Sequence, residues 1–220
     1  MDGDRIYNGA LDNASGTALL IEVGRVLAAH RSELKRSLVF AAVTAEEQGL
    51  LGSEYYVEHP VFPLDRTVAN INFDGINVWG ETEDMVAMGA ERSTIRNVVA
   101  QVFSAMNINR TADPFPEKGY FFRSDQFSFV KAGVPAVYYD YGLRFRGKPA
   151  DWGEKLMTRY VEQHYHQRSD EYDPTWPLEG AVQMGQVVVR TAELLSAQEE
   201  RPRWNEGDPF AQASSRPPGE

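Results

Sequence analysis

The chain has 220 residues, of which 42% are hydrophobic, a composition that predicts one sizeable domain with a hydrophobic core. Its 32 acidic and 22 basic residues give a formal net charge of −10, which argues against nucleic acid and anionic membrane surfaces as partners and is compatible with metal cations. The absence of cysteine excludes disulfides and thiolate zinc sites, and no run approaches the roughly 20 apolar residues of a membrane span.

The amino-terminal half of the chain is expected to alternate helices and strands. Apolar residues at helical spacing predict a helix over residues 12–30. The apolar run LVFAAVTA is typical of a buried strand, predicted over residues 36–45, and it leads directly into the adjacent carboxylates of Glu46 and Glu47. The other elements expected here are a short helix over 50–58 and strands over 67–76 and 84–90.

The carboxyl-terminal half continues the alternation. Its expected elements, in chain order, are a helix over 93–107, a helix over 124–133, a strand over 135–142, a long polar and aromatic loop over 143–165, and a helix over 178–196. A loop of that length in a compact domain is often functional. Residues 198–220 are rich in Pro, Gly, Glu, Arg and Ser, so we expect a folded domain over residues 1–197 followed by a loose tail.

Strands that alternate with helices predict an α/β fold, with a mostly parallel sheet flanked by helices on both faces. In such sheets ligands bind outside the carboxyl ends of the strands. This rule selects Glu46 and Glu47 after the first predicted strand, Asp74 near the end of the second, and Asp140 near the end of the last.

Each acidic candidate also has a structural explanation. The Glu46–Glu47 pair could be a solvated strand end or the first turn of a helix, and position alone leaves the two explanations evenly balanced. Asp74 precedes a glycine, as in many turns, but it would share the polar face of its strand with Asn72, which slightly favours function. Asp12 could cap the following helix, although the small residues around it would also let a second ligand approach.

The remaining candidates carry weaker signals. His164 and His166 are two of the four histidines and lie in one loop, where only one of them is expected to face a given site. Asp125 is predicted to cap the helix that follows it. Three or four carboxylates at strand ends together with one histidine suit a divalent cation such as zinc, manganese or cobalt. One glutamate of the pair would then be a ligand and the other a general base.

Five segments together resemble the M28 family of co-catalytic zinc aminopeptidases, in the order and at the separations of that family. They are GALDNASGTALLIEVGRVLA, VTAEEQGLLGSEYYV, NINFDGI, RSDQFSFVKAGVPAVYY and YHQRSDEYD, and the similarity extends from about Gly9 to Ser196. The resemblance implies a three-layer zinc-aminopeptidase-like sandwich. It also implies hydrolysis of peptide bonds next to a free amino terminus, with one or two zinc ions per chain.

The resemblance implies a role for each matching residue. Asp12 matches the aspartate that bridges both zincs, Glu47 and His166 match ligands of one zinc, and Asp74 matches a ligand of the other. Glu46 matches the general base that takes a proton from the bridging water and passes it to the leaving amine. Near the Ser-Asp motif, Tyr120 and Asp125 are the candidates for the substrate side, and Gln126 stands where the family often has histidine.

The sequence departs from the family at its amino-terminal end. The family carries a further histidine ligand, in a His-x-Asp motif at the end of an earlier strand, and no histidine precedes Asp12 here. The chain therefore resembles the carboxyl-terminal part of an M28 catalytic domain without its first strands. We expect a weakened second metal site, and an exposed sheet edge that is covered either by self-association or by a complementing amino-terminal segment.

Two other functions remain open from the sequence. One is a glutaminyl-cyclase-like acyltransferase, or a carboxypeptidase, on the same scaffold; cyclases of this type run on one zinc. The other is a metal-binding remnant without catalysis. The family resemblance also suggests a secreted or periplasmic protein, and neither the preferred amino-terminal residue nor the physiological metal follows from the sequence.

Overall fold

A computed structural model describes residues 6–211 of the chain, and its centre is a four-stranded sheet. The strand order is β1-β4-β2-β3, in which β1 pairs with β4 and β2 with β3 in parallel, while β2 and β4 are antiparallel. This mixed, mostly parallel sheet with flanking helices confirms the predicted α/β class. The strands are β1 (Asn70–Asn72), β2 (Asp84–Met88), β3 (Asn109–Thr111) and β4 (Ala136–Tyr141).

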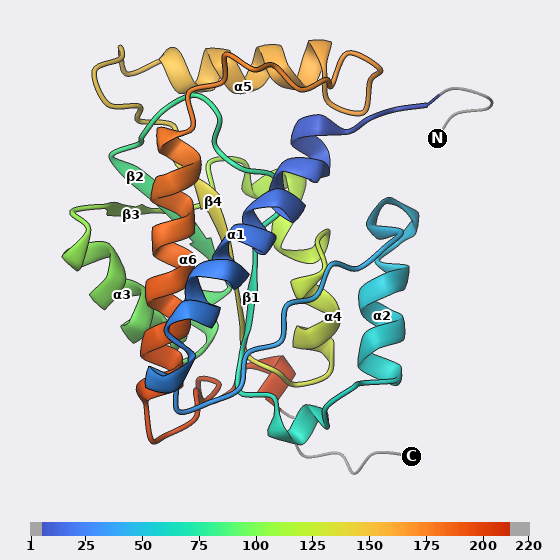
Figure 1. The fold of residues 1–220 in the computed structure, drawn as a ribbon, viewed down its shortest axis with the longest axis vertical. Coiled ribbons are helices and arrows are strands. Elements are labelled where there is room, and N and C mark those ends of the chain that lie inside the picture. Colours follow the sequence, from blue (N-terminus) through green and yellow to red (C-terminus); the bar gives the residue numbers. More distant parts are fainter. Residues whose placement is uncertain (1–5, 212–220) are drawn as a thin grey trace.

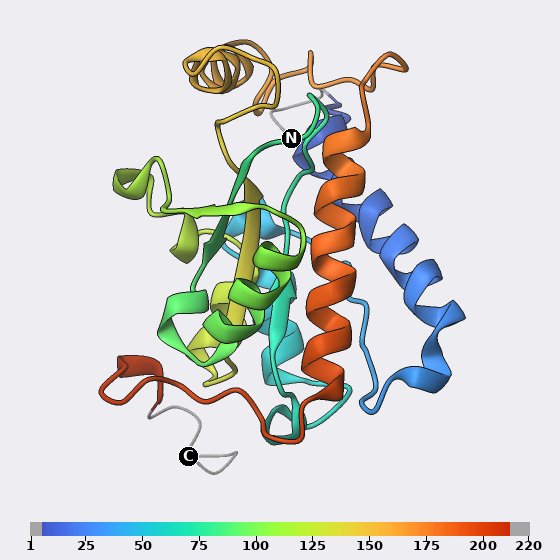
Figure 2. The same ribbon diagram turned by 90° about the vertical axis from the view of Figure 1, so that its left-hand side faces the viewer.

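Helices cover both faces of the sheet (Figures 1 and 2). Helices α1, α3 and α6 lie on one face and α2 and α4 on the other, while α5 crosses the end at which β1 and β4 finish. Among the residues that the structure describes, no helix is both long and apolar enough to cross a membrane. The helices are α1 (Ser15–Ala29), α2 (Leu51–Glu58), α3 (Ile95–Ala105), α4 (Gln126–Lys131), α5 (Trp152–Gln163) and α6 (Glu179–Ala197).

The main core lies between the sheet and the helices α1, α3 and α6. Leu19, Val23 and Leu27 recur every four residues along α1, so that one stripe of this helix is buried. The strand β4 contributes Tyr139, whose ring is fully buried and whose hydroxyl lies 2.8 Å from the hydroxyl of Thr191 on α6. This hydrogen bond satisfies both polar groups inside an otherwise apolar core.

The predicted strand over residues 36–45 is wrong for this structure. The segment is extended, but residues 37–43 make no backbone hydrogen bond with any other residue in the described part of the chain. A groove of about 610 Å³ separates the segment from β1. Val39 and Phe40 are accordingly 50% and 44% exposed. An apolar run becomes a strand only when a neighbouring strand pairs with it, and none of the described strands pairs with this segment.

Three further differences concern the elements around the sheet. The helix α5 occupies part of the predicted loop over 143–165, because Trp152 packs on Phe145 and Tyr160 packs on Trp79. The short strand β3 was not expected, and β1 is shorter than the predicted 67–76.

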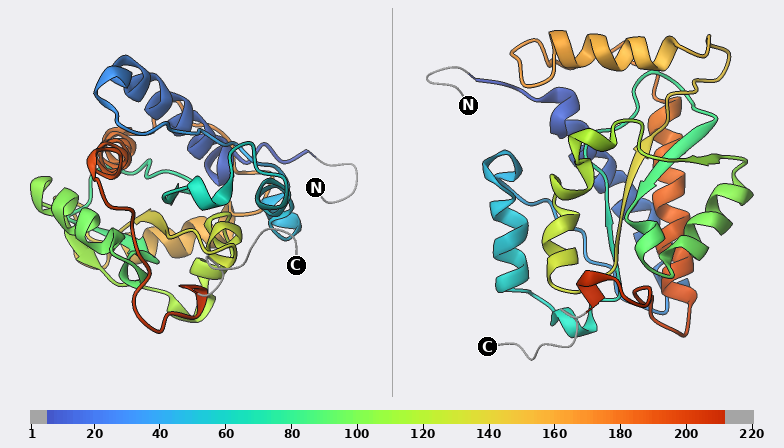
Figure 3. Two further views of the ribbon diagram at one scale, coloured as in Figure 1. Left: turned by 90° about the horizontal axis from the view of Figure 1, so that it is seen from below. Right: turned by 180° about the vertical axis from the view of Figure 1, so that it is seen from behind.

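The segment after α6 is also ordered differently from the expectation of a loose tail. As far as residue 211, where the description ends, it folds back across the lower end of the sheet (Figure 3). The indole N–H of Trp204 donates to the carbonyl oxygen of Gly133 at 2.8 Å, and Arg92 forms an ion pair with Asp208. Residues 212–220, the rest of the expected tail, lie outside the described residues.

Candidate metal centre

The loop that carries Asp12 is held in place by a distant aspartate. Both carboxylate oxygens of Asp170 accept backbone hydrogen bonds, one from Leu11 at 2.9 Å and the other from Asp12 at 3.0 Å. Asp170 itself is only 4% exposed. Because the backbone amide of Asp12 is fixed, its carboxylate is directed toward the site. Asp12 is not the cap of α1, since that position belongs to Ala14.

Asn13 joins this loop to the end of β1. Its side-chain oxygen accepts hydrogen bonds from the N–H of Gly16, in the first turn of α1, and from the N–H of Gly75. Gly75 directly follows Asp74 and has a φ of 77°, a left-handed conformation that favours glycine. The loops of Asp12 and Asp74 are therefore connected by one side chain.

Glu46 and Glu47 lie in a tight turn between the extended segment and α2. The residues Glu46–Gln48 form one turn of 3₁₀ helix, with Ala45 and Gly49 in the left-handed region at φ 58° and 98°. The turn places the two neighbouring carboxylates in different surroundings. Glu47 contacts His166. Glu46 is partly buried near Asp74, and this burial and the charge of Asp74 raise its pKa.

Asp12, Glu47 and His166 converge at one point. Nε2 of His166 lies 2.7 Å from the Glu47 carboxylate and 3.3 Å from that of Asp12, and one ligand atom of each residue lies within 4.8 Å of the other two. His166 has a φ of 58°, a conformation that residues other than glycine adopt rarely and that often accompanies functional sites. His164 points elsewhere, with Nδ1 3.0 Å from the carbonyl oxygen of Ser169.

The site is crowded with negative charge. Burial, followed by the charges of Asp74 and Glu47, raises the pKa of Asp12 to about 7. Burial and the same two acids raise the pKa of Glu46 to about 8. Two carboxylates, one imidazole and no thiolate form a donor set that suits zinc, manganese or cobalt, and a cation among them would remove the repulsion. The residues present therefore fit a divalent metal.

The other predicted residues, Asp74, Asp125 and Tyr120, are not part of this group of three donors. Asp74 accepts a hydrogen bond from the hydroxyl of Ser124 at 3.1 Å, and burial raises its pKa above the usual range. Asp125 occupies the position before α4 but makes no capping bond, and its Oδ1 is buried without a hydrogen-bond partner in the described chain. Tyr120 packs on the small apolar cluster that contains Tyr138. The substrate roles of Tyr120 and Asp125 stay predictions.

Sequence reasoning missed several residues that shape the site. The ring of Tyr165 stacks on that of His166 with centroids 3.8 Å apart, and the pKa of Tyr165 is raised by burial and then by Asp12. Asp170 stood only four positions after His166, but nothing local indicated that it binds a loop more than 150 residues earlier. The available signal was its position in the same polar segment as the histidine.

Comparisons with known proteins identify relatives over most of the chain. The model of peptidase family M28 matches residues 1–192. The chain is 27% identical over 208 residues to aminopeptidase YwaD of Bacillus subtilis, a match that covers 94% of this chain and 42% of the relative. The structure is similar to that of the Legionella pneumophila LapA aminopeptidase, with a TM-score of 0.63 and 20% identity over 90% of this chain and 49% of that one.

A third similarity is to glutaminyl cyclase of Porphyromonas gingivalis, with a TM-score of 0.50 and 17% identity over 86% of this chain and 64% of the cyclase. At identities of 20% and 17%, the similarity to the Legionella and Porphyromonas structures shows a shared fold. The chain spans less than half the length of the Bacillus relative and of the Legionella structure, at 42% and 49%. Since the family model covers most of its residues, the chain belongs to peptidase family M28.

Proposed function

We propose that this chain is the metal-binding part of a zinc aminopeptidase, which hydrolyses the peptide bond next to a free amino terminus. The observation that carries the proposal is the convergence of Asp12, Glu47 and His166 beside Glu46. Three donors suit one divalent metal, and Glu46, a third carboxylate outside that group, is free for proton transfer. The names of the aminopeptidase relatives support the same reaction.

Asp12, Glu47 and His166 would hold the first zinc, and Asp12 together with Asp74 would hold a second one. When bound, zinc supplies a Lewis acid that polarises the scissile carbonyl and lowers the pKa of water. Manganese or cobalt could take the same place, because the ligand set is permissive. Among the described residues, the second zinc has fewer ligands than the first, so we expect it to bind more weakly.

Glu46 is the proposed general base. Its pKa of about 8 belongs to a site without a compensating positive charge, and such a charge nearby would lower it. At neutral pH the ionised carboxylate would take a proton from the attacking water and return it to the leaving amine. The side chain is free for this work, since Glu47 rather than Glu46 contacts His166.

The second candidate function is a glutaminyl-cyclase-like acyltransferase that runs on one zinc. Two observations favour it: the similarity in fold to the Porphyromonas cyclase, and a close group of three donors among the described residues. A third possibility is a metal-binding protein without catalysis. Incubation with aminoacyl-anilides and with glutaminyl peptides separates the two reactions, and a lack of turnover on both substrates supports the third.

The first experiment is the zinc content per chain after saturation and removal of loosely bound metal. Two zincs per chain would support the co-catalytic aminopeptidase. One zinc would support a weakened hydrolase or the cyclase, which the two substrates then distinguish. A chain that retains no zinc would contradict both catalytic proposals.

A further inference from the structure

Asp140 is a carboxylate near the metal centre that the proposed mechanism does not use. It lies near the end of β4, and its Oδ1 accepts a hydrogen bond from the backbone N–H of Tyr141 at 2.8 Å. The neighbouring charges that raise its pKa belong to Asp74 and Asp113, which are both acidic. Among the described residues, no cation forms an ion pair with Asp140. This carboxylate therefore lacks a positive partner.

The register of the sheet places Asp140 beside Asp74. Asn72 of β1 pairs with Tyr138 of β4, and the two strands are parallel. Asp74 and Asp140 each follow this pair by two residues, and a step of two residues along a strand returns to the same face. Neighbouring strands lie about 4.8 Å apart. The effect of Asp74 on the pKa of Asp140 agrees with this proximity.

The side chain of Asp140 points away from the main core. The hydroxyl of Tyr139 reaches α6, so the two neighbours of Tyr139 in the strand point to the opposite face of the sheet. On that face Asp140 pairs with Val86, which belongs to the small cluster that contains Tyr138 and on which Tyr120 packs. Asp140 itself is partly exposed. A reachable carboxylate thus lies next to two tyrosine rings.

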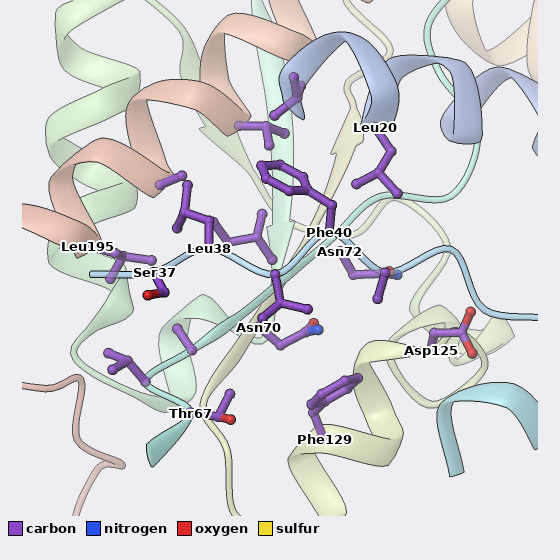
Figure 4. A pocket seen from close by; sticks show the side chains of 18 of the residues that line it. Leu20, Ser37, Leu38, Phe40, Thr67, Asn70, Asn72, Asp125, Phe129 and Leu195 are labelled. Carbon is purple, nitrogen blue, oxygen red and sulfur yellow. The ribbon is translucent and has the colours of Figure 1, made fainter. Parts of the chain in front are cut away.

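The surroundings of Asp140 do not belong to the groove between residues 37–43 and β1 (Figure 4). Asn72 and Asp125 are among the residues that line this groove, whereas Asp140 and Tyr120 are not. A ligand of Asp140 therefore extends from the metal centre past Asp74 and leaves the groove unoccupied.

We propose that Asp140 binds the positively charged side chain of the first residue of the substrate, so that the site prefers peptides that begin with lysine or arginine. This inference rests on the proposed aminopeptidase function and names its substrate class. The methylene stem of the lysine packs on the rings of Tyr138 and Tyr120, and its ammonium group donates to the carboxylate of Asp140.

The position of Asp140 favours a side chain over the free amino group of the substrate. The α-amino group is bonded to the same carbon as the scissile carbonyl, so it stays at the metal centre. The acids with the largest effects on the pKa values of Asp12 and Glu46 include Asp74 and Glu47 but not Asp140. Asp140 therefore lies beyond Asp74 from the reacting bond, where a long side chain reaches it.

The test compares two amino acid amides as ligands of the zinc-saturated chain, with binding followed by NMR titration. L-norleucinamide is L-lysinamide without its ammonium group, so the pair isolates the charge of the side chain. Both amides carry the same free α-amino group. We expect L-lysinamide to bind at least about tenfold more tightly, the usual scale of a hydrogen bond between charged groups.

A substitution at Asp140 locates the preference. Asp140→Asn removes the charge and keeps the shape, so L-lysinamide is expected to bind as weakly as L-norleucinamide, whose own affinity stays the same. Glu193→Gln makes the same change of charge at an exposed residue of α6, on the other face of the sheet, and should leave both affinities unchanged. Thermal unfolding establishes that both variants are folded.

Three results would overturn the proposal: equal binding of the two amides, binding of neither amide, or an unchanged preference in Asp140→Asn. Hydrolysis of lysyl-anilide and leucyl-anilide, measured on the same preparations, tests the proposed function separately. A chain that prefers L-lysinamide but hydrolyses neither anilide contradicts the aminopeptidase and supports the binding role of Asp140. A chain that hydrolyses both anilides but binds the two amides equally contradicts the role of Asp140 alone.

Discussion

The side-chain oxygen of Asn13 accepts a hydrogen bond from the backbone N–H of Gly75 at 2.7 Å, and this bond ties the loop of Asp12 to the loop of Asp74. Asn13→Ala removes this bond and the one from Gly16. We expect a loss of about 1–3 kcal/mol in the free energy of unfolding and weaker zinc binding. Urea denaturation and zinc titration measure the two effects. Thr17→Val, a change at an exposed residue nearby, should leave both nearly unchanged.

Asp170→Asn tests how the Asp12 loop is positioned. Asparagine keeps one acceptor but presents an NH₂ group to the second of the two backbone amides that Asp170 binds. We expect a destabilisation of about 1–3 kcal/mol and lower zinc affinity, because a buried N–H loses its partner. Glu171→Gln is the matched control, since Glu171 is exposed and its side chain binds, among the described residues, only that of Asn8. Equal effects of the two variants would contradict the positioning role.

The two histidines of one loop form a natural pair of variants. His166→Ala removes a donor of the convergent group and should lower zinc content or affinity by at least about tenfold, a loss in the range seen for supporting residues of metal sites. His164→Ala removes a contact to Ser169 and should bind zinc as the parent chain does. Equilibrium dialysis against zinc distinguishes the two. Metal binding that depends on His164 would place the site elsewhere.

Glu46→Gln removes the proposed base without removing a metal donor. We expect the rate of hydrolysis to fall by about 10²–10⁴-fold, the usual contribution of general acid–base catalysis, with zinc content unchanged. The measurement is kcat on an aminoacyl-anilide, with zinc determined on the same preparation. Activity that survives this substitution would show that the assigned mechanism is wrong.

The metal-free chain should become less stable as the pH rises from about 4 to 8. The ordinary pKa values of Asp12 and Glu46 are 3.8 and 4.5, but in the folded chain they are raised to about 7 and about 8. Between these limits the folded state binds more protons than the unfolded state, so raising the pH favours unfolding. Asp140, whose burial raises its pKa to about 7, acts in the same direction.

Thermal unfolding in the presence of a chelator, at pH 5 and at pH 8, measures this trend. Excess zinc should restore stability chiefly at pH 8, because a cation compensates the ionised acids. Glu46→Gln should flatten the pH dependence, since glutamine does not titrate. A metal-free chain that is equally stable at both pH values would contradict the repulsion in this site.

The long helices could be predicted from sequence because their signal is local. Apolar residues at helical spacing indicated α1, α3 and α6 within a few residues of their ends. The strand over residues 36–45 could not be settled locally, because pairing depends on a neighbour that is distant in sequence or absent from the chain. For α5, an apolar stripe was present at Trp152, Leu156 and Tyr160, but the polar and aromatic composition of residues 143–165 led to the prediction of a loop.

The same distinction applies to the metal centre. Asp12, Glu47 and His166 could be proposed because each lies in a recognisable motif, and the structure brings them together. Asp170 could not be assigned its role, since the role consists of hydrogen bonds to residues about 160 positions earlier. Residues that hold a site in place are visible only when the fold is known.

The segment that follows α6 has a practical consequence for how the chain can be cut or fused. Trp204 donates a hydrogen bond to Gly133, and Phe210 packs on Phe127 of α4, so this segment connects the end of α6 to the helical layer on the opposite face of the sheet. A version that stops at the end of α6 would lose these contacts and expose the ring of Phe127. We therefore expect affinity tags and reporter domains to disturb folding when they replace residues 198–211.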